Sequence, residues 1–139
     1  MIAVDTNAIA YLWIPGDNTA LAEKVLQKDR EWATSSLWRS EFRNVLANYM
    51  RRGELTVDEA CECMERAAAQ LAGYEYKVPS RPVMQLVACS KCTAYDCEFV
   101  TVAEDLGVPL VTSDKLILQE FPDVAISLTD FPRRLRSSS

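Results

Sequence analysis

Four acidic residues of this chain occupy positions from which separate elements could deliver them to one place. Asp5 follows the apolar opening run of residues 1–4, and Asp114 follows a second apolar run at residues 108–112. Both runs are typical of short, buried parallel strands, and an open α/β sheet binds ligands at the carboxyl ends of its strands. The other two acids begin or lie early in helical patterns that could face this edge. The complete set is Asp5, Glu41, Asp96 and Asp114.

Carboxylates that gather in one pocket predict a divalent cation, because four like charges repel one another. Carboxylate ligands, with water completing the shell, favour Mg²⁺ or Mn²⁺ over zinc. The chain contains no histidine. Its absence excludes Ser-His-Asp and Cys-His catalysis, so proton transfer must involve carboxylates, lysine, tyrosine or metal-bound water. Four carboxylates with open coordination positions on the metal would suit hydrolysis by a metal-activated water.

Short polar neighbours accompany the acids and could orient them or hold a metal-bound water. Thr6 and Asn7 follow the first acid, and Thr112 precedes the last one by two positions. Asn44 falls on the same helical face as Glu41, three residues further along. Singly, each acid could be a helix cap or a solvated side chain; the combination is what favours a site.

The cysteines favour a reduced, cytoplasmic protein without a metal–thiolate site. There are five, an odd number, and no secretion signal or membrane-spanning run accompanies them. Residues 61–63 and 89–92 each contain two cysteines, but a structural zinc site usually needs paired motifs or histidines. We therefore expect the cysteines to act as small core residues, with zinc as the minor alternative.

Although the net charge is −5, the acidic and basic residues outside the four-acid cluster are nearly equal in number. Removing the four clustered acids from the 20 acidic residues leaves 16, against 15 basic residues. Grouped arginines are therefore candidates for contacts with backbone phosphates, although a solvated helix face or tail is an equal alternative. The candidates are Arg39 and Arg43, with Arg133, Arg134 and Arg136 near the C-terminus.

Alternating strand and helix patterns predict a single three-layer α/β/α domain with a central, mostly parallel sheet of four to five strands. The domain should cover residues 1–132, and residues 133–139 should form a flexible basic and serine-rich tail. We expect Thr6 or Asn7, Ser36 and Thr93 to cap helices. The strands are expected at residues 1–5, 31–35, 74–78, 108–112 and 124–127, and the helices at about 7–13, 18–28, 37–52, 57–72, 82–89, 94–106 and 114–118.

Four segments of the sequence resemble the conserved blocks of PIN domains. The opening Asp-Thr-Asn after an N-terminal strand and a helical Glu followed by Asn match the first two blocks. A helical Asp and the final Val-Thr-Ser-Asp resemble the third and fourth, and the last block is the most specific. The matching segments are residues 5–7, 40–46, 95–100 and 103–114.

The resemblance implies a nuclease, and the compact length with a central helical hairpin is similar to the VapC group of toxin ribonucleases. It implies that the four acids bind metal and catalyse, that Thr112 supports them, and that products carry a 5′-phosphate and a 3′-hydroxyl. It further implies a homodimer and an inhibiting antitoxin, which lays a helix in a hydrophobic groove and places a basic side chain in the acidic pocket. Candidate groove or dimer residues, with core packing as the alternative, are Trp13, Trp38, Tyr49, Met50 and Met64.

Three other functions fit parts of the pattern. A receiver-like phosphoacceptor domain also places acids at strand ends, but it needs an acidic pair at the first strand and gives Glu41 no role. A binding module with a structural metal would ligate its ion completely. A PIN nuclease in RNA processing would share the chemistry without a toxin role. Glu98, two positions after Asp96, is expected to point away from the site.

Overall fold

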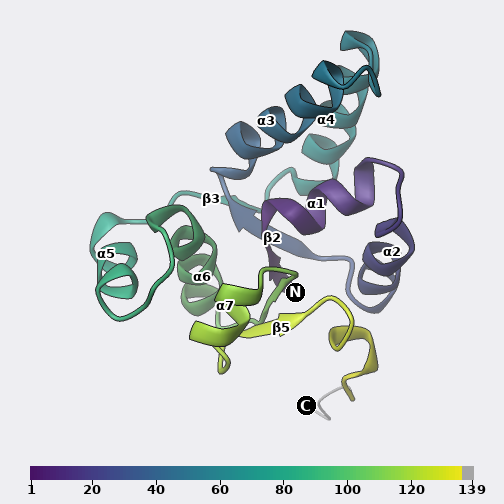
Figure 1. Cartoon of the computed structure of the whole chain (residues 1–139). Coiled ribbons are helices and arrows are strands. Elements are labelled where there is room, and N and C mark those ends of the chain that lie inside the picture. Colours follow the sequence, from purple (N-terminus) through teal and green to yellow (C-terminus); the bar gives the residue numbers. More distant parts are fainter. Residues whose placement is uncertain (136–139) are drawn as a thin grey trace.

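The computed structural model describes residues 1–135 and contains a parallel sheet with helices on both faces (Figure 1). The strands are β1 (Ile2–Val4), β2 (Trp32–Ser35), β3 (Glu75–Tyr76), β4 (Leu110–Thr112) and β5 (Ala125–Ser127). The helices are α1 (Thr6–Trp13), α2 (Thr19–Lys28), α3 (Trp38–Arg51), α4 (Val57–Leu71), α5 (Ser80–Ala88), α6 (Ala94–Leu106), α7 (Lys115–Glu120) and the 3₁₀ turn η1 (Phe131–Arg133). The predicted α/β architecture is confirmed.

The order of the strands, β3-β2-β1-β4-β5, sets β1 at the centre of the sheet. All four strand pairs are parallel, and Val4 of β1 lies beside Val111 of β4. Because β1 and β4 are parallel neighbours, the residues that follow them leave the sheet at the same edge. This arrangement brings the chain segments that carry Asp5 and Asp114 close together.

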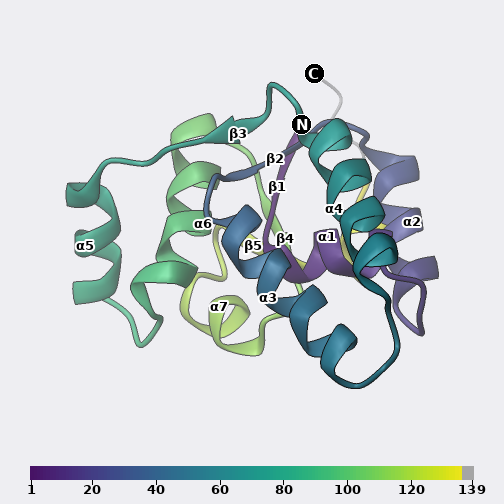
Figure 2. The same cartoon turned by 90° about the horizontal axis from the view of Figure 1, so that it is seen from above.

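Two groups of helices enclose the sheet. Viewed from above, α5 and α6 lie on one side of the sheet, and α1, α2 and α4 lie on the other (Figure 2). Helices α3 and α4 form the predicted antiparallel hairpin, which extends beyond the sheet (Figure 1). The turn between them is closed by Gly53 at φ 76°, a left-handed conformation that glycine adopts at little cost.

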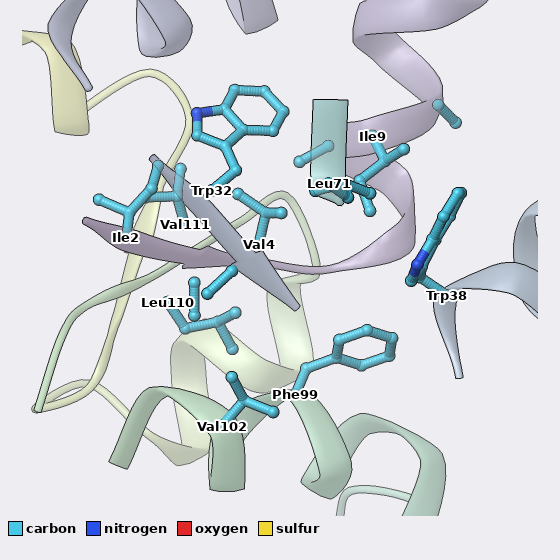
Figure 3. Close-up of a cluster of buried hydrophobic side chains, with 14 of the residues drawn as sticks. Ile2, Val4, Ile9, Trp32, Trp38, Leu71, Phe99, Val102, Leu110 and Val111 are labelled. Atoms are coloured by element: carbon cyan, nitrogen blue, oxygen red, sulfur yellow. The ribbon is translucent and has the colours of Figure 1, made fainter. Parts of the chain in front are cut away.

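The core consists of aliphatic and aromatic side chains on both sides of the sheet (Figure 3). Ile9 of α1 and Leu71 of α4 lie toward one face, and Phe99 and Val102 of α6 lie toward the other. Every residue of β1, β2 and β4 is buried, as expected for central strands covered by helices on both faces.

Two of the predicted helix caps are wrong. The N-cap of α1 is Asp5, whose carboxylate accepts from the backbone N–H of Ala8, and not Thr6 or Asn7. Ser36 does not cap α3 because its backbone N–H donates to the carbonyl of Tyr76 and so extends the pairing of β2 with β3. The cap predicted for α6 is confirmed: Thr93 accepts from the N–H of Asp96.

The C-terminal segment returns to the start of the chain. Lys28 of α2 donates to the carbonyls of Phe131 and Arg134, and Phe131 is buried. The backbone at Phe131 and Arg134 is therefore tied to α2, although Leu135 is exposed, and Arg136 and the serine tail lie outside the described residues. Within residues 1–135, no helix combines the length and apolar character needed to cross a bilayer.

Candidate functional site

A pocket of about 440 Å³ opens at the carboxyl edge of the sheet, and all four predicted acids line it. Two of the acids follow strands β1 and β4, and the other two lie in the first turns of α3 and α6. Four segments distant in sequence therefore meet at one cavity. The lining is Asp5, Thr6, Asn7, Leu37, Ser40, Glu41, Asn44, Val45, Tyr95, Asp96, Phe99 and Asp114.

Asp5 is the most buried of the four acids, with 5% of its surface exposed. One carboxylate oxygen accepts from the backbone N–H of Ala8 at 3.1 Å, and the other accepts from the hydroxyl of Thr112. Thr112 also accepts from the N–H of Asp114 at 3.0 Å. The hydroxyl thus fixes the end of β4 relative to the end of β1, which gives the predicted supporting residue a physical role.

Thr6 orients the carboxylate of Glu41 through a side-chain hydrogen bond. Its hydroxyl donates to a carboxylate oxygen of Glu41 at 2.6 Å, and Thr6 itself is 6% exposed. The bond links the start of α1 to the first turn of α3. Because the hydroxyl can only orient one of the two oxygens, the other keeps its lone pairs free to face the pocket.

The remaining two acids are placed by helix capping. Asp114 is the N-cap of α7, and its carboxylate accepts from the N–H of Ile117 at 2.9 Å. Asp96 lies in the first turn of α6, where Thr93 holds its backbone. A carboxylate at a helix N-terminus is favoured by the helix dipole, and this offsets part of the repulsion between the acids.

Burial and the charges of neighbouring acids raise the pKa values of three of the four acids: Asp5, Glu41 and Asp96. Burial raises the pKa of Asp5 to about 6, and the charges of Asp114 and Glu41 add to this, although the Thr112 hydrogen bond opposes it. Burial, and then the charge of Asp96, raise the pKa of Glu41 against the hydrogen bond from Thr6. Burial, and then the charge of Asp114, raise the pKa of Asp96. The pocket therefore disfavours full ionisation unless a cation is present.

No positively charged side chain within residues 1–135 lines the pocket or forms an ion pair with these acids. A donor set made of carboxylate oxygens fits Mg²⁺ or Mn²⁺. In this conformation, however, no three His, Cys, Asp or Glu side chains of residues 1–135 are close enough to hold an ion. The carboxylates line one cavity, and they would have to approach one another to share an ion.

A family model described as PIN domain matches residues 2–124 of this sequence. The chain belongs to the PIN domain family. A curated relative, Ribonuclease VapC3 of Pyrobaculum aerophilum, is 31% identical over 124 residues, which are 87% of this chain and 95% of the relative. Membership of this family rules out the receiver-like alternative.

Solved structures share the fold of this PIN domain. PAE2754 of Pyrobaculum aerophilum superposes with a TM-score of 0.75 at 22% identity, covering 96% of this chain and 87% of the other. FitAcB of Neisseria gonorrhoeae gives a TM-score of 0.70 at 21% identity and covers 97% and 100%. A toxin–antitoxin complex from Klebsiella pneumoniae gives 0.68 at 14% identity and covers 92% and 98%. At these identities, the likeness concerns the fold alone.

The arginines predicted to bind phosphate do not share one place in this PIN domain. The guanidinium of Arg39 donates to both carboxylate oxygens of Glu75, at 2.7 and 2.9 Å, and so joins α3 to β3. Arg43 is exposed and makes no ion pair within residues 1–135. Arg134 lines a hollow with Met1, which precedes β1 and so lies at the opposite edge of the sheet from the acids.

Glu98 lies nearer to the site than its sequence position predicts. It does not line the pocket, but its carboxylate accepts from the hydroxyl of Ser35 at 2.9 Å. Its charge also contributes to the raised pKa of Glu41. The sequence offers no signal for this proximity, because it depends on how α6 packs against the end of β2.

The cysteines and aromatic residues follow the predictions only in part. All five thiols are free; Cys92 and Cys97 are buried, whereas Cys61 and Cys89 are exposed and therefore not core residues. Trp38 is fully buried and belongs to the core, so it is excluded from any groove or dimer surface. The other candidates for such a surface are half-buried: Trp13, Tyr49, Met50 and Met64.

Proposed function

We propose that this PIN domain is a divalent-metal-dependent endoribonuclease and the toxin of a toxin–antitoxin pair. The observation that carries the proposal is the convergence of four carboxylates from β1, α3, α6 and β4 on one pocket without any basic neighbour. The 31% identity to a relative named Ribonuclease VapC3 supports RNA as the substrate.

The pocket residues of the chain have distinct tasks in this reaction. When bound, Mg²⁺ or Mn²⁺ would lower the pKa of a water molecule and neutralise charge on the scissile phosphate. Asp5, Glu41, Asp96 and Asp114 would hold the ion, and Thr112 and Thr6 keep the first two carboxylates oriented. Asn7 and Asn44, both exposed at the pocket, can donate hydrogen bonds to water or to phosphate oxygens.

Protonation should oppose metal binding. A carboxylate must lose its proton to serve as a ligand, so binding releases a proton from Asp5 whenever the pH is near its pKa of about 6. Ionised Asp5 then keeps its hydrogen bonds from Ala8 and Thr112, which both stabilise the charged form.

Cleavage of a single-stranded RNA by the purified protein, with Mg²⁺ and with EDTA, tests the proposal. We expect cleavage only with the metal, and products with a 5′-phosphate and a 3′-hydroxyl. A substrate with one deoxyribose at the cut should still be cleaved, because water and not the 2′-hydroxyl attacks. Complete resistance of that substrate, or a 2′,3′-cyclic phosphate product, would contradict water attack.

Contacts with the RNA backbone are assigned to Arg43. It is exposed on α3, within the same two turns as Glu41 and Asn44, and no carboxylate of residues 1–135 is paired with it. The neighbouring Arg39 is already held by Glu75, so we give it a structural role instead.

We further propose an antitoxin partner and a homodimer, acting in the cytoplasm. A structural neighbour is a toxin–antitoxin complex, and an arginine of a partner would find four unpaired carboxylates in the pocket. The five free thiols agree with a reducing compartment. Co-expression with the product of an adjacent short reading frame should yield a stable, inactive complex. If the protein formed no such complex and its expression did not inhibit cell growth, an RNA-processing nuclease without a toxin role would be favoured.

A further inference from the structure

The acidic pocket has an apolar wall that neither a divalent cation nor a phosphate group requires. Leu37 and Val45 contribute to this wall from the start and middle of α3, and Tyr95 and Phe99 lie one helical turn apart on α6. Apolar carbon atoms do not ligate metal or donate hydrogen bonds to phosphate. The wall therefore fits a different part of the substrate.

Tyr95 is the exposed member of this wall. Its side chain is 61% exposed although it directly precedes Asp96, whereas Phe99 is 3% exposed and belongs to the core. The hydroxyl of Tyr95 makes no hydrogen bond within residues 1–135, in contrast to that of Tyr11, which pairs with Ser113 at 3.2 Å. An exposed aromatic ring at the mouth of a pocket has a free face on which a planar group can stack.

Unpaired polar groups lie beside the same wall. Asn7, Ser40 and Asn44 are exposed and line the pocket, and their side chains make no hydrogen bond to other residues in the part of the chain that the structure describes. A side-chain amide offers two N–H donors and a carbonyl acceptor, the complement of a nucleobase edge. The pocket thus combines a stacking surface with free base-edge partners.

We propose that the pocket contains a subsite for one unpaired nucleobase, which stacks on Tyr95 next to the scissile phosphate and turns its edge toward Asn44. This inference rests on the proposed ribonuclease function and narrows it to single-stranded or unpaired positions of RNA. Proteins read RNA in this way, by stacking splayed bases on aromatic rings and bonding their edges. The cavity of about 440 Å³ falls in the range of roughly 300–1,000 Å³ used for small ligands.

The test combines a variant with a modified substrate. The cut site of the unaltered protein is first mapped on a mixed-sequence single-stranded RNA. Substrates are then made with an abasic nucleotide on either side of that cut, and kcat/KM is measured for the unaltered protein, Tyr95→Phe and Tyr95→Ala. Met84→Ala serves as the matched control, because Met84 is 56% exposed on α5 and does not line the pocket.

Loss of the ring should lower kcat/KM on intact RNA by about 5- to 150-fold, the range measured for base–aromatic stacking. Tyr95→Phe and Met84→Ala should cleave like the unaltered protein. For the unaltered protein, kcat/KM should fall by the same factor on one of the two abasic substrates. For Tyr95→Ala, that abasic substrate and intact RNA should give nearly the same kcat/KM, because the ring and the base form a single contact.

The subsite would be overturned if removing the ring and removing the base lowered kcat/KM by factors that multiply, because the two groups would then act independently. Full activity of Tyr95→Ala on intact RNA would also overturn it. Full activity together with weaker capture by a protein partner would assign Tyr95 to that partner instead. If the unaltered protein cleaves no RNA at all, the proposed function fails and this inference with it. If the unaltered protein cleaves and only the coupling is missing, the subsite alone is wrong.

Discussion

Thr112, the last residue of β4, donates its hydroxyl hydrogen to the buried carboxylate of Asp5, which follows the adjacent strand β1. The two residues are 107 positions apart in the sequence. The bond lowers the pKa of Asp5, against the larger effect of burial that raises it. Thr112 therefore lowers the pH at which Asp5 ionises.

Metal-dependent cleavage should decline as the pH falls through about 6, because Asp5 then holds a proton that competes with the ion. Thr112→Val removes the hydrogen bond and should raise the pKa of Asp5, moving the acidic limb of the profile to higher pH. Rate–pH profiles at subsaturating Mn²⁺ measure this limb. Thr112→Ser restores the hydroxyl and should restore the profile. An unchanged limb in Thr112→Val would contradict this role of Thr112.

Asp5→Asn should stabilise the protein at neutral pH when EDTA removes divalent cations. Folding raises the pKa of Asp5 from 3.8 to about 6, so its stabilising contribution, present at low pH, is lost as the pH rises through about 6. The neutral amide avoids a loss of up to about 3 kcal/mol, and it can still cap α1. Urea unfolding at pH 7.5 and pH 4.5 measures the effect.

The advantage of Asp5→Asn should shrink to about 1 kcal/mol at pH 4.5, where the folded carboxyl is largely protonated but the unfolded one, with its ordinary pKa of 3.8, is still mostly ionised. If Asp5→Asn were less stable than the wild type at pH 7.5 in EDTA, the charge of Asp5 would not destabilise the folded protein.

Thr6→Val should weaken metal binding by about 10- to 100-fold, the usual cost of losing a group that orients a ligand. The hydroxyl of Thr6 donates to Glu41 at 2.6 Å, and valine keeps the volume of the side chain while removing the donor. Calorimetric titration with Mn²⁺ measures the affinity, and Thr6→Ser should recover it. Equal affinities of Thr6→Val and the wild type would show that Glu41 needs no such orientation.

Arg39 and Arg43 should behave differently although they lie on the same helix. Arg39→Ala breaks the paired contact with Glu75, which also accepts from the indole N–H of Trp38, and should lower stability by about 1 kcal/mol. Arg43→Ala should leave stability unchanged and weaken RNA binding. It should also reduce by about one the slope of the logarithm of the RNA-binding constant against the logarithm of the salt concentration. Thermal unfolding measures the effect on stability, and RNA-binding titrations across salt concentrations measure the effect on binding. Lower stability of Arg43→Ala together with weaker RNA binding of Arg39→Ala would contradict both assignments.

The sequence predicts those parts of the site that depend on local chemistry. Asp5 and Asp114 could be placed because both follow apolar strands, and parallel strands release their following residues at one edge. Asp96 could be placed in the first turn of a helix because Thr93 is a strong cap.

Contacts set by tertiary packing could not be predicted in this way. Ser36 has the chemistry of a helix cap, but its backbone remains paired with β3. The Arg39–Glu75 pair depends on where the chain places a two-residue strand after the helical hairpin. The approach of Glu98 to Ser35 depends on the packing of α6 against β2. None of these has a local sequence signal.

Direct titration with Mn²⁺, followed by electron paramagnetic resonance of the free ion, tests the shared carboxylate site most directly. At pH 7.5 the unaltered protein should bind the ion, and Asp5→Asn, Glu41→Gln, Asp96→Asn and Asp114→Asn should each weaken binding by about tenfold or more. Glu104→Gln, at an exposed position away from the pocket, should bind like the unaltered protein. Affinity that survives in all four pocket variants, or an unaltered protein that binds no Mn²⁺, would contradict the account.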